Sequence, residues 1–211
     1  MNHQHQTSNV ILPDEQHSAI LYRPHQPPER LSCLTGFAVF PGSFNPLHEG
    51  HKKLRSVAQQ RLGREVVYEI SVSNVEKHPL TPADLQVRLA QFENASVLIT
   101  NAARFIEKAR IARQSPFVVG FDTAQRILDP RFYGNDRQFL DAMTQLTEEC
   151  PRIVVGGRLA KARTTTQFCS QPELNVPVVC KELFEFIPES EFRSDISSSE
   201  LRAGPRGNHT D

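Results

Sequence analysis

The chain has 211 residues, enough for one domain with a hydrophobic core, and its 24 basic and 24 acidic side chains balance. This balance argues against nucleic acid as a partner. No apolar run approaches the roughly 20 residues that a membrane helix needs, and no secretory signal pattern opens the chain. Four scattered cysteines without a Cys-x-x-Cys pair are typical of a reduced protein. We therefore expect a cytoplasmic protein that acts on small molecules and does not contact a membrane.

Three parts are predicted from composition. Residues 1–32 are polar and rich in Gln, His and Pro, apart from one apolar patch at residues 20–22. They are expected to form a partly disordered arm. Residues 33–205 are expected to form the domain, and residues 206–211 a short tail.

Apolar runs and helical periodicity alternate through the domain. Strands are predicted at 37–40, 66–72, 97–100, 117–120 and within 152–158. Helices are predicted to follow them at about 48–62, 81–92, 105–109, 123–128 and 136–149. Residues 159–175 show no clear period. Short strands are expected at 176–180 and 183–187, and a last helix from residue 197.

Nearly continuous apolar strands alternating with helices predict an α/β fold. The expected form is a Rossmann-like, doubly wound parallel sheet of about five strands with helices on both faces. Ligands bind such sheets at the carboxyl ends of the strands, where the strand order reverses. The loops expected on that rim are 42–51, 74–78, 120–122 and 156–158, and they carry the unusual polar residues of the chain.

The stretch 37–51 carries the clearest chemical signal. A glycine-containing loop between a strand and a helix N-terminus leaves backbone N–H groups free to bind phosphate. His48 and His51 are three residues apart, so both project from one face of the first helical turn. A metal hydrolase built on these histidines is disfavoured, because the zinc helix motif needs histidines four apart, and no metal site is expected within the protein.

Residues 42–51, Gly-Ser-Phe-Asn-Pro-Leu-His-Glu-Gly-His, resemble the His-x-Gly-His signature of the nucleotidylyltransferase superfamily. The Gly-Ser-Phe-Asn-Pro lead-in is most similar to nicotinamide or nicotinate mononucleotide adenylyltransferases. Residues 196–202, Ile-Ser-Ser-Ser-Glu-Leu-Arg, resemble a second signature, Ile-Ser-Ser-Thr-x-x-Arg. The resemblance covers roughly residues 36 to 203.

The resemblance implies roles for specific side chains. Catalytic contacts with phosphate are implied for His48, His51, Lys77 and Arg202, with Arg88 and Arg193 as further cations. Nucleotide contacts are implied for Gly42, Ser43, Phe44, Gly120, Asp122, Gly157, Arg158, Ile196, Ser197, Ser198 and Ser199. Asn45 is an acceptor-side candidate. The chain lacks the tryptophan that pyridine-nucleotide relatives place after Gly-x-Asp, so Phe132 or Tyr133 either stacks on the acceptor instead or packs within its loop.

The implied reaction is transfer of AMP from ATP, with Mg²⁺, to a phosphate-bearing acceptor. Nicotinamide or nicotinate mononucleotide is the expected acceptor, and pyrophosphate is released. Two alternatives stay within the class: a phosphopantetheine adenylyltransferase-like enzyme and a cytidylyltransferase. A third alternative is a non-catalytic nucleotide-binding module. The sequence leaves the oligomeric state open, including a homo-oligomer.

Overall fold

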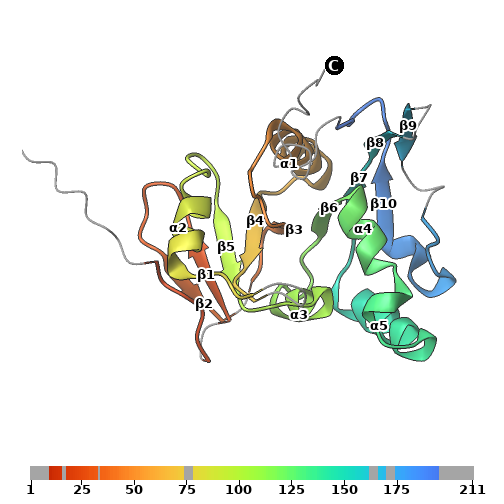
Figure 1. Cartoon of the computed structure of the whole chain (residues 1–211), viewed down its shortest axis with the longest axis horizontal. Coiled ribbons are helices and arrows are strands. Elements are labelled where there is room, and N and C mark those ends of the chain that lie inside the picture. The colour runs from red at the N-terminus through yellow and green to blue at the C-terminus, as the bar shows by residue number, and fades with distance from the viewer. Residues whose placement is uncertain are drawn as a thin grey trace, which may run out of the picture.

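The computed structural model describes residues 10–15, 18–32, 34–73, 78–161, 166–169 and 174–194 (Figure 1). Within them an eight-stranded sheet has the order β10-β7-β6-β3-β4-β5-β1-β2, and a hairpin forms a second sheet, β8-β9. The strands are β1 (Ala19–Tyr22), β2 (Glu29–Leu31), β3 (Ala38–Pro41), β4 (Val66–Ser71), β5 (Val97–Thr100), β6 (Phe117–Gly120), β7 (Ile153–Gly156), β8 (Arg158–Lys161), β9 (Thr166–Cys169) and β10 (Phe184–Ile187).

Helices cover both faces of the sheet. They are α1 (Glu49–Leu62), α2 (Pro82–Leu89), α3 (Phe105–Ile111), α4 (Phe121–Ile127) and α5 (Asp136–Glu149), with short 3₁₀ turns η1 (Pro130–Phe132) and η3 (Val178–Leu183). Alternate residues of each strand face opposite sides. Val39 packs in the core that holds α3, α4 and α5, whereas Ala38 and Phe40 pack in the core that holds α1 and α2.

The predicted fold class is confirmed. The five predicted strands are β3 to β7, and these strands and β10 pair in parallel, as a doubly wound sheet requires. The strand count is larger than predicted. Strands β1 and β2 extend the sheet in antiparallel pairing, and the hairpin β8-β9 lies where the sequence shows no period. Residues 178–183 form η3, where a strand over 176–180 was expected.

The N-terminal region differs from the prediction of a polar arm up to residue 32. Strand β1 pairs with β5, and its Ile20 and Leu21 are buried at 0% and 1% exposure. The hydroxyl of Tyr22 accepts a hydrogen bond from Ile11 N at 2.7 Å and donates one to Ile11 O at 3.0 Å. The short apolar patch therefore covers the open edge of β5, which an exposed strand would leave unpaired. Sheet residues begin at Ala19 rather than after residue 32.

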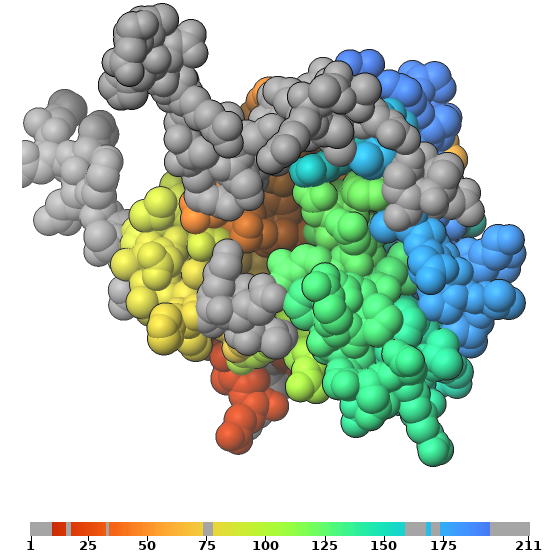
Figure 2. All heavy atoms as spheres, turned by 45° about the vertical axis from the view of Figure 1, so that its right-hand side comes forward, coloured from red at the N-terminus to blue at the C-terminus, as the bar shows by residue number. Residues whose placement is uncertain are grey.

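The strand order reverses at β3. From β3 the chain adds β4 and β5 on one side, and then β6, β7 and β10 on the other. The loops after β3 and β6 consequently flank the switch point, where ligands bind in such sheets. Figure 2 shows the β3–α1 region, in orange, recessed between the α2 region in yellow and the β6–α4 region in green.

Replacing Ile20 tests whether β1 belongs to the core. Ile20→Ala should lower the free energy of unfolding by about 2–5 kcal/mol, the usual cost of removing a buried aliphatic side chain. Val87→Ala is the control, because Val87 is 71% exposed on α2 and should change stability by less than about 0.5 kcal/mol. Urea denaturation measures both. Equal stability of Ile20→Ala and wild type would show that this segment is an undocked arm.

Candidate active site

The loop between β3 and α1 is held in shape by a buried aromatic ring. Phe44 is 1% exposed, and its ring centroid lies 5.5 Å from that of Phe40, 4.9 Å from Tyr68 and 5.6 Å from Phe92. A Cβ on Gly42 would lie 2.6 Å from the Phe44 ring, so the ring occupies the space that glycine leaves. The sequence predicts that Gly42 leaves room for a nucleotide. In the structure, the space beside Gly42 is occupied by the Phe44 ring.

Helix α2 clamps the same loop from the side. Arg88 Nη1 donates to Ser43 O at 2.6 Å, and Gln91 Nε2 donates to Phe44 O at 3.1 Å. Gln91 Oε1 in turn accepts from Leu47 N at 2.8 Å. The sequence predicts Arg88 as a phosphate contact, whereas the structure shows it on the loop backbone. Gln91, in the turn just after α2, was not predicted, since a single amide carries no sequence signal.

Helix α2 begins with a capping box. Thr81 Oγ1 accepts from Asp84 N at 3.1 Å, and Asp84 Oδ2 accepts from Thr81 N at 3.0 Å. Pro82 follows at the first helical position.

His48 and His51 lie together on the first turn of α1, as their spacing predicts. Their rings are stacked, with centroids 3.7 Å apart and planes 23° apart. His48 N donates to His51 Nδ1 at 3.3 Å. The His51 ring also lies 5.0 Å from the Phe44 ring, so the aromatic cluster beneath the loop supports the histidine pair.

Burial keeps both imidazoles neutral. Desolvation, with a smaller effect of neighbouring His48, lowers the pKa of His51 to about 3. Desolvation also lowers the pKa of His48, although the Glu49 carboxylate opposes the shift. Because His51 Nδ1 accepts a backbone hydrogen bond, the proton of the neutral ring is on Nε2. His51 therefore offers an Nε2–H donor to a ligand.

One nitrogen of the pair lacks a partner. His48 Nδ1 is buried and has no hydrogen-bond partner among the described residues. Buried polar atoms are normally satisfied, so within the described part of the chain this nitrogen is available to a ligand at the start of α1.

The last described residue lies against this turn. A Cβ on Gly50 would lie 2.5 Å from Ser194 Oγ and 3.0 Å from His48 Nδ1. Ser194 therefore places the end of the described chain, two residues before Ile196 in sequence, against the first turn of α1. Lys77, Ile196, Ser197, Ser198, Ser199 and Arg202 lie outside the described residues, and their roles stay predictions.

The rim after β6 and β7 brings two other predicted residues together. Asp122 Oδ2 accepts from Arg158 Nη1 at 2.7 Å, and both side chains are partly exposed. A Cβ on Gly120 would meet nothing within 4 Å, so the backbone there borders open space. At Gly157 a Cβ would lie 2.2 Å from the Phe168 ring, so packing of the β8-β9 hairpin already requires this glycine.

The remaining predicted residues lie apart or have other partners. Asn45 is exposed in the β3–α1 loop, and Arg193 Nη1 donates to Glu189 at 3.2 Å. Phe132 and Tyr133 follow α4, about 10 Å of helix away from Gly120. Tyr133 is engaged in packing, since its hydroxyl donates to Ile127 O at 2.8 Å and its ring lies 5.3 Å from the Phe139 ring. Phe132 is 46% exposed, with the Arg126 guanidinium 5.3 Å from its ring centroid.

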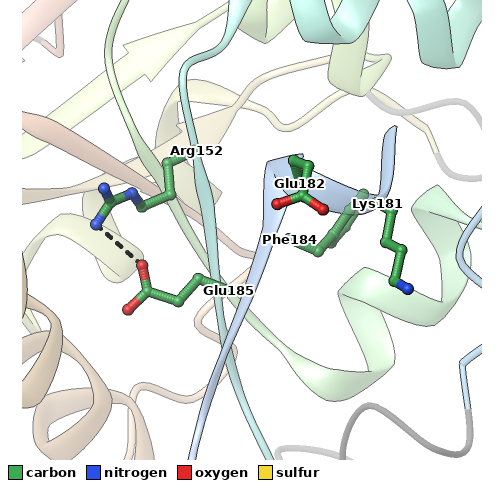
Figure 3. Close-up of a pocket in the computed structure, with 5 residues that line it drawn as sticks. All are labelled: Arg152, Lys181, Glu182, Phe184 and Glu185. Atoms are coloured by element: carbon green, nitrogen blue, oxygen red, sulfur yellow. Dashed lines mark ion pairs between the residues drawn. The ribbon is translucent and has the colours of Figure 1, made fainter. Parts of the chain in front are cut away.

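A depression at the opposite end of the sheet is separate from these residues (Figure 3). It is lined by Arg152, Lys181, Glu182, Phe184 and Glu185, which precede or begin β7 and β10. Arg152 and Glu185 form an ion pair at 2.9 Å across it. It lies at the amino ends of the strands, away from the switch-point loops.

The low pKa of His51 predicts an acid-sensitive fold. Between pH 6.5 and about 3 the His51 imidazole is protonated in the unfolded chain but stays neutral in the folded protein. Stability therefore falls as the pH falls through this window, by at most about 1.4 kcal/mol per pH unit. His51→Asn keeps an acceptor for His48 N but removes this titration, so its unfolding free energy should fall less between pH 7 and 5. Urea denaturation at pH 7, 6 and 5 measures the difference, and identical pH slopes would contradict the buried, neutral His51.

Comparisons with known proteins agree with this geometry. Residues 39–204 match the family described as "Cytidylyltransferase-like". A Schizosaccharomyces pombe protein named "Putative nicotinamide mononucleotide adenylyltransferase" is 29% identical over 142 residues, which cover 60% of this chain and 55% of that protein. The chain thus spans about half the length of this curated relative.

No helix in the described part of the chain is long and apolar enough to cross a membrane. The resemblance to nucleotidylyltransferases is confirmed, and the chain belongs to the cytidylyltransferase-like family.

Proposed function

We propose that the protein transfers AMP from ATP to a phosphate-bearing acceptor, nicotinamide or nicotinate mononucleotide, and releases pyrophosphate. The observation that carries the proposal is the stacked, neutral His48–His51 pair at the start of α1, beside the switch point of the sheet. Within the described residues, His48 Nδ1 of this pair is buried without a hydrogen-bond partner. Family membership supports the general reaction.

The triphosphate would bind at the N-terminus of α1, where free backbone N–H groups and the helix dipole favour anions. An acceptor phosphate oxygen then attacks the α-phosphorus of ATP in line. A new P–O bond forms as the bond to the bridging oxygen breaks, and pyrophosphate leaves with that electron pair. The attacking phosphate is already ionised, so the protein need not supply a base, and catalysis is positioning and charge stabilisation.

The histidines act as hydrogen-bond donors in this scheme. His51 Nε2–H would donate to a phosphate oxygen as negative charge grows on the leaving group. Ser197, Ser198, Ser199 and Arg202 are proposed to hold the pyrophosphate on the other side, and Ser194 beside Gly50 supports this arrangement. Asp122 and Arg158, paired on the neighbouring rim, are proposed to contact the nucleotide.

Mg²⁺ is proposed to enter with ATP rather than as a resident metal. Mg²⁺ is bound mainly by substrate phosphates and water, and it would neutralise charge on the leaving pyrophosphate. Among the described residues no group of three or more His, Cys, Asp or Glu lies together, and no resident metal is part of this proposal.

The acceptor is proposed from the Asn45-Pro46 lead-in and from the name of the fission yeast relative. The positions of Phe132 and Tyr133 do not support stacking on a pyridine ring, because Tyr133 packs in the core and both lie beyond α4. The proposal for this acceptor therefore depends on a ring-binding surface made by other residues.

Replacing His51 tests the reaction. His51→Asn should reduce the rate of pyrophosphate release from ATP and nicotinamide mononucleotide by about 10²–10³, the cost of losing one charge-stabilising donor. His25→Asn is the matched control, because His25 is exposed with φ 58° in the turn between β1 and β2, and Asn tolerates that conformation. The assay should also pair the four nucleoside triphosphates with several phosphorylated acceptors. Full turnover by His51→Asn would refute the catalytic assignment, and ATP binding without turnover on any acceptor would favour a non-catalytic module.

Adding a methyl group at Gly50 tests the packing of Ser194 and His48 at the first turn of α1. Gly50→Ala places a Cβ 2.5 Å from Ser194 Oγ and 3.0 Å from His48 Nδ1, so these side chains must shift, and the rate should fall by up to about 10²-fold. Gly50→Ala combined with Ser194→Ala removes the closer of the two clashing atoms and should regain part of the rate. Wild-type kinetics in Gly50→Ala would show that turnover does not depend on this packing.

A further inference from the structure

A buried ion pair lies next to the candidate site without belonging to it. Glu69 on β4 is 1% exposed, and it is the one acidic or basic residue classed as buried in the part of the chain that the structure describes. Lys108 on α3 pairs with it, and its side chain is 13% exposed. Buried ion pairs are poor stabilising devices, since desolvation offsets their attraction. We therefore expect the Glu69–Lys108 pair to have a role beyond stability.

The pair is fully hydrogen bonded. Lys108 Nζ donates to Glu69 Oε1 at 2.8 Å, to Glu69 Oε2 at 3.0 Å and to Ala102 O at 2.8 Å. Thr100 Oγ1 donates to Glu69 Oε1 at 2.5 Å. These bonds use all three donors of the ammonium group. Lys108 consequently acts on neighbouring protein groups rather than directly on a phosphate.

The bonds connect two loops on the carboxyl rim. Glu69 O accepts from Gly42 N at 3.0 Å, which ties β4 to the loop before α1. The Glu69 side chain and Lys108 together hold Ala102, whose N also donates to Thr100 Oγ1 at 3.3 Å. Ala102 lies in the loop of residues 101–104 between β5 and α3. Figure 1 shows β3, β4 and β5 side by side. The side-chain pair itself links β4 to the 101–104 loop, and the tie to the loop before α1 is a backbone bond of the same Glu69.

The 101–104 loop leads to the face of the sheet opposite α1. The loops after β3 and β4 lead to α1 and α2 on one face, whereas those after β5 and β6 lead to α3 and α4 on the other. In-line transfer places the attacking group opposite the leaving pyrophosphate, which the proposed function assigns to the α1 side. The same loop carries exposed Arg104, a cation suited to a phosphorylated acceptor.

We propose that Glu69 and Lys108 are positioning residues that fix the 101–104 loop as the acceptor-binding wall of the site. This inference rests on the proposed function, because it assigns one of that reaction's two substrates to this loop. The pair acts through the backbone of Ala102 and touches neither substrate.

The test compares Lys108→Met with the double variant Glu69→Gln/Lys108→Met. Lys108→Met leaves a buried carboxylate unpaired, so its thermal midpoint should fall, whereas the double variant removes both charges and should regain stability. Both variants lack the bond to Ala102 O. Both should raise KM for nicotinamide mononucleotide about tenfold, the factor for roughly one charged hydrogen bond, and leave KM for ATP within about twofold.

Met143→Ala is the control for stability alone. Met143 is 1% exposed on α5 and lies in the core rather than on the rim. It should lower the thermal midpoint without changing the ratio of the two KM values. The proposal is overturned if the double variant regains the wild-type KM for nicotinamide mononucleotide together with its stability. It is also overturned if the two KM values rise equally. The same holds if Met143→Ala raises the KM for nicotinamide mononucleotide without raising the KM for ATP.

A second readout separates this inference from the proposed function. Amide hydrogen exchange of residues 102–104 should be about tenfold faster in Lys108→Met than in wild type, since the loop loses its tie. Unchanged exchange overturns the positioning role, whatever the wild type turns over. Wild-type protein that turns over no acceptor refutes the proposed function and the acceptor assignment, whereas faster exchange would still establish that the pair orders the loop.

Discussion

The burial of the Phe44 ring is the constraint on which the candidate site depends. Phe44 has a φ of 42°, in a region that bulky residues seldom adopt. Its packing against Phe40, Tyr68 and Phe92 offsets that cost. Gly42 accommodates the ring, and Arg88 on α2 and Gln91 in the turn after α2 hold the loop backbone. The histidine pair rests on this support, because the His51 ring lies against Phe44.

The same burial shapes the electrostatics of the first turn of α1. Desolvation holds both imidazoles neutral, and the exposed Glu49 pairs with Lys52 at 2.7 Å. The turn thus presents helix N–H groups and ring N–H donors without a fixed negative charge directed at the ligand. Such a surface is suited to a phosphate group, whose own charge the helix dipole and the donors stabilise.

Much of the scaffold could be predicted because it is encoded in local patterns. The start of α2 beside residue 81, the end of α1 at residue 62 and the span of α5 over 136–149 agree with the structure. Strands β1 and β2 and the hairpin β8-β9 could not be predicted. Each is three or four residues long, and each is defined by pairing with a partner rather than by its own periodicity.

The α/β alternation, the glycine loop before a helix and the placing of His48 and His51 on one face could be predicted, because these features depend on spacings of a few residues. The roles of Lys77 and of residues 196–202 remain predictions. The folded chain was needed to show that Arg88 binds the Ser43 carbonyl, that Asp122 pairs with Arg158 and that Glu69 meets Lys108. These contacts join segments roughly 36 to 45 residues apart. Strand order and register, which no local period encodes, bring such segments together.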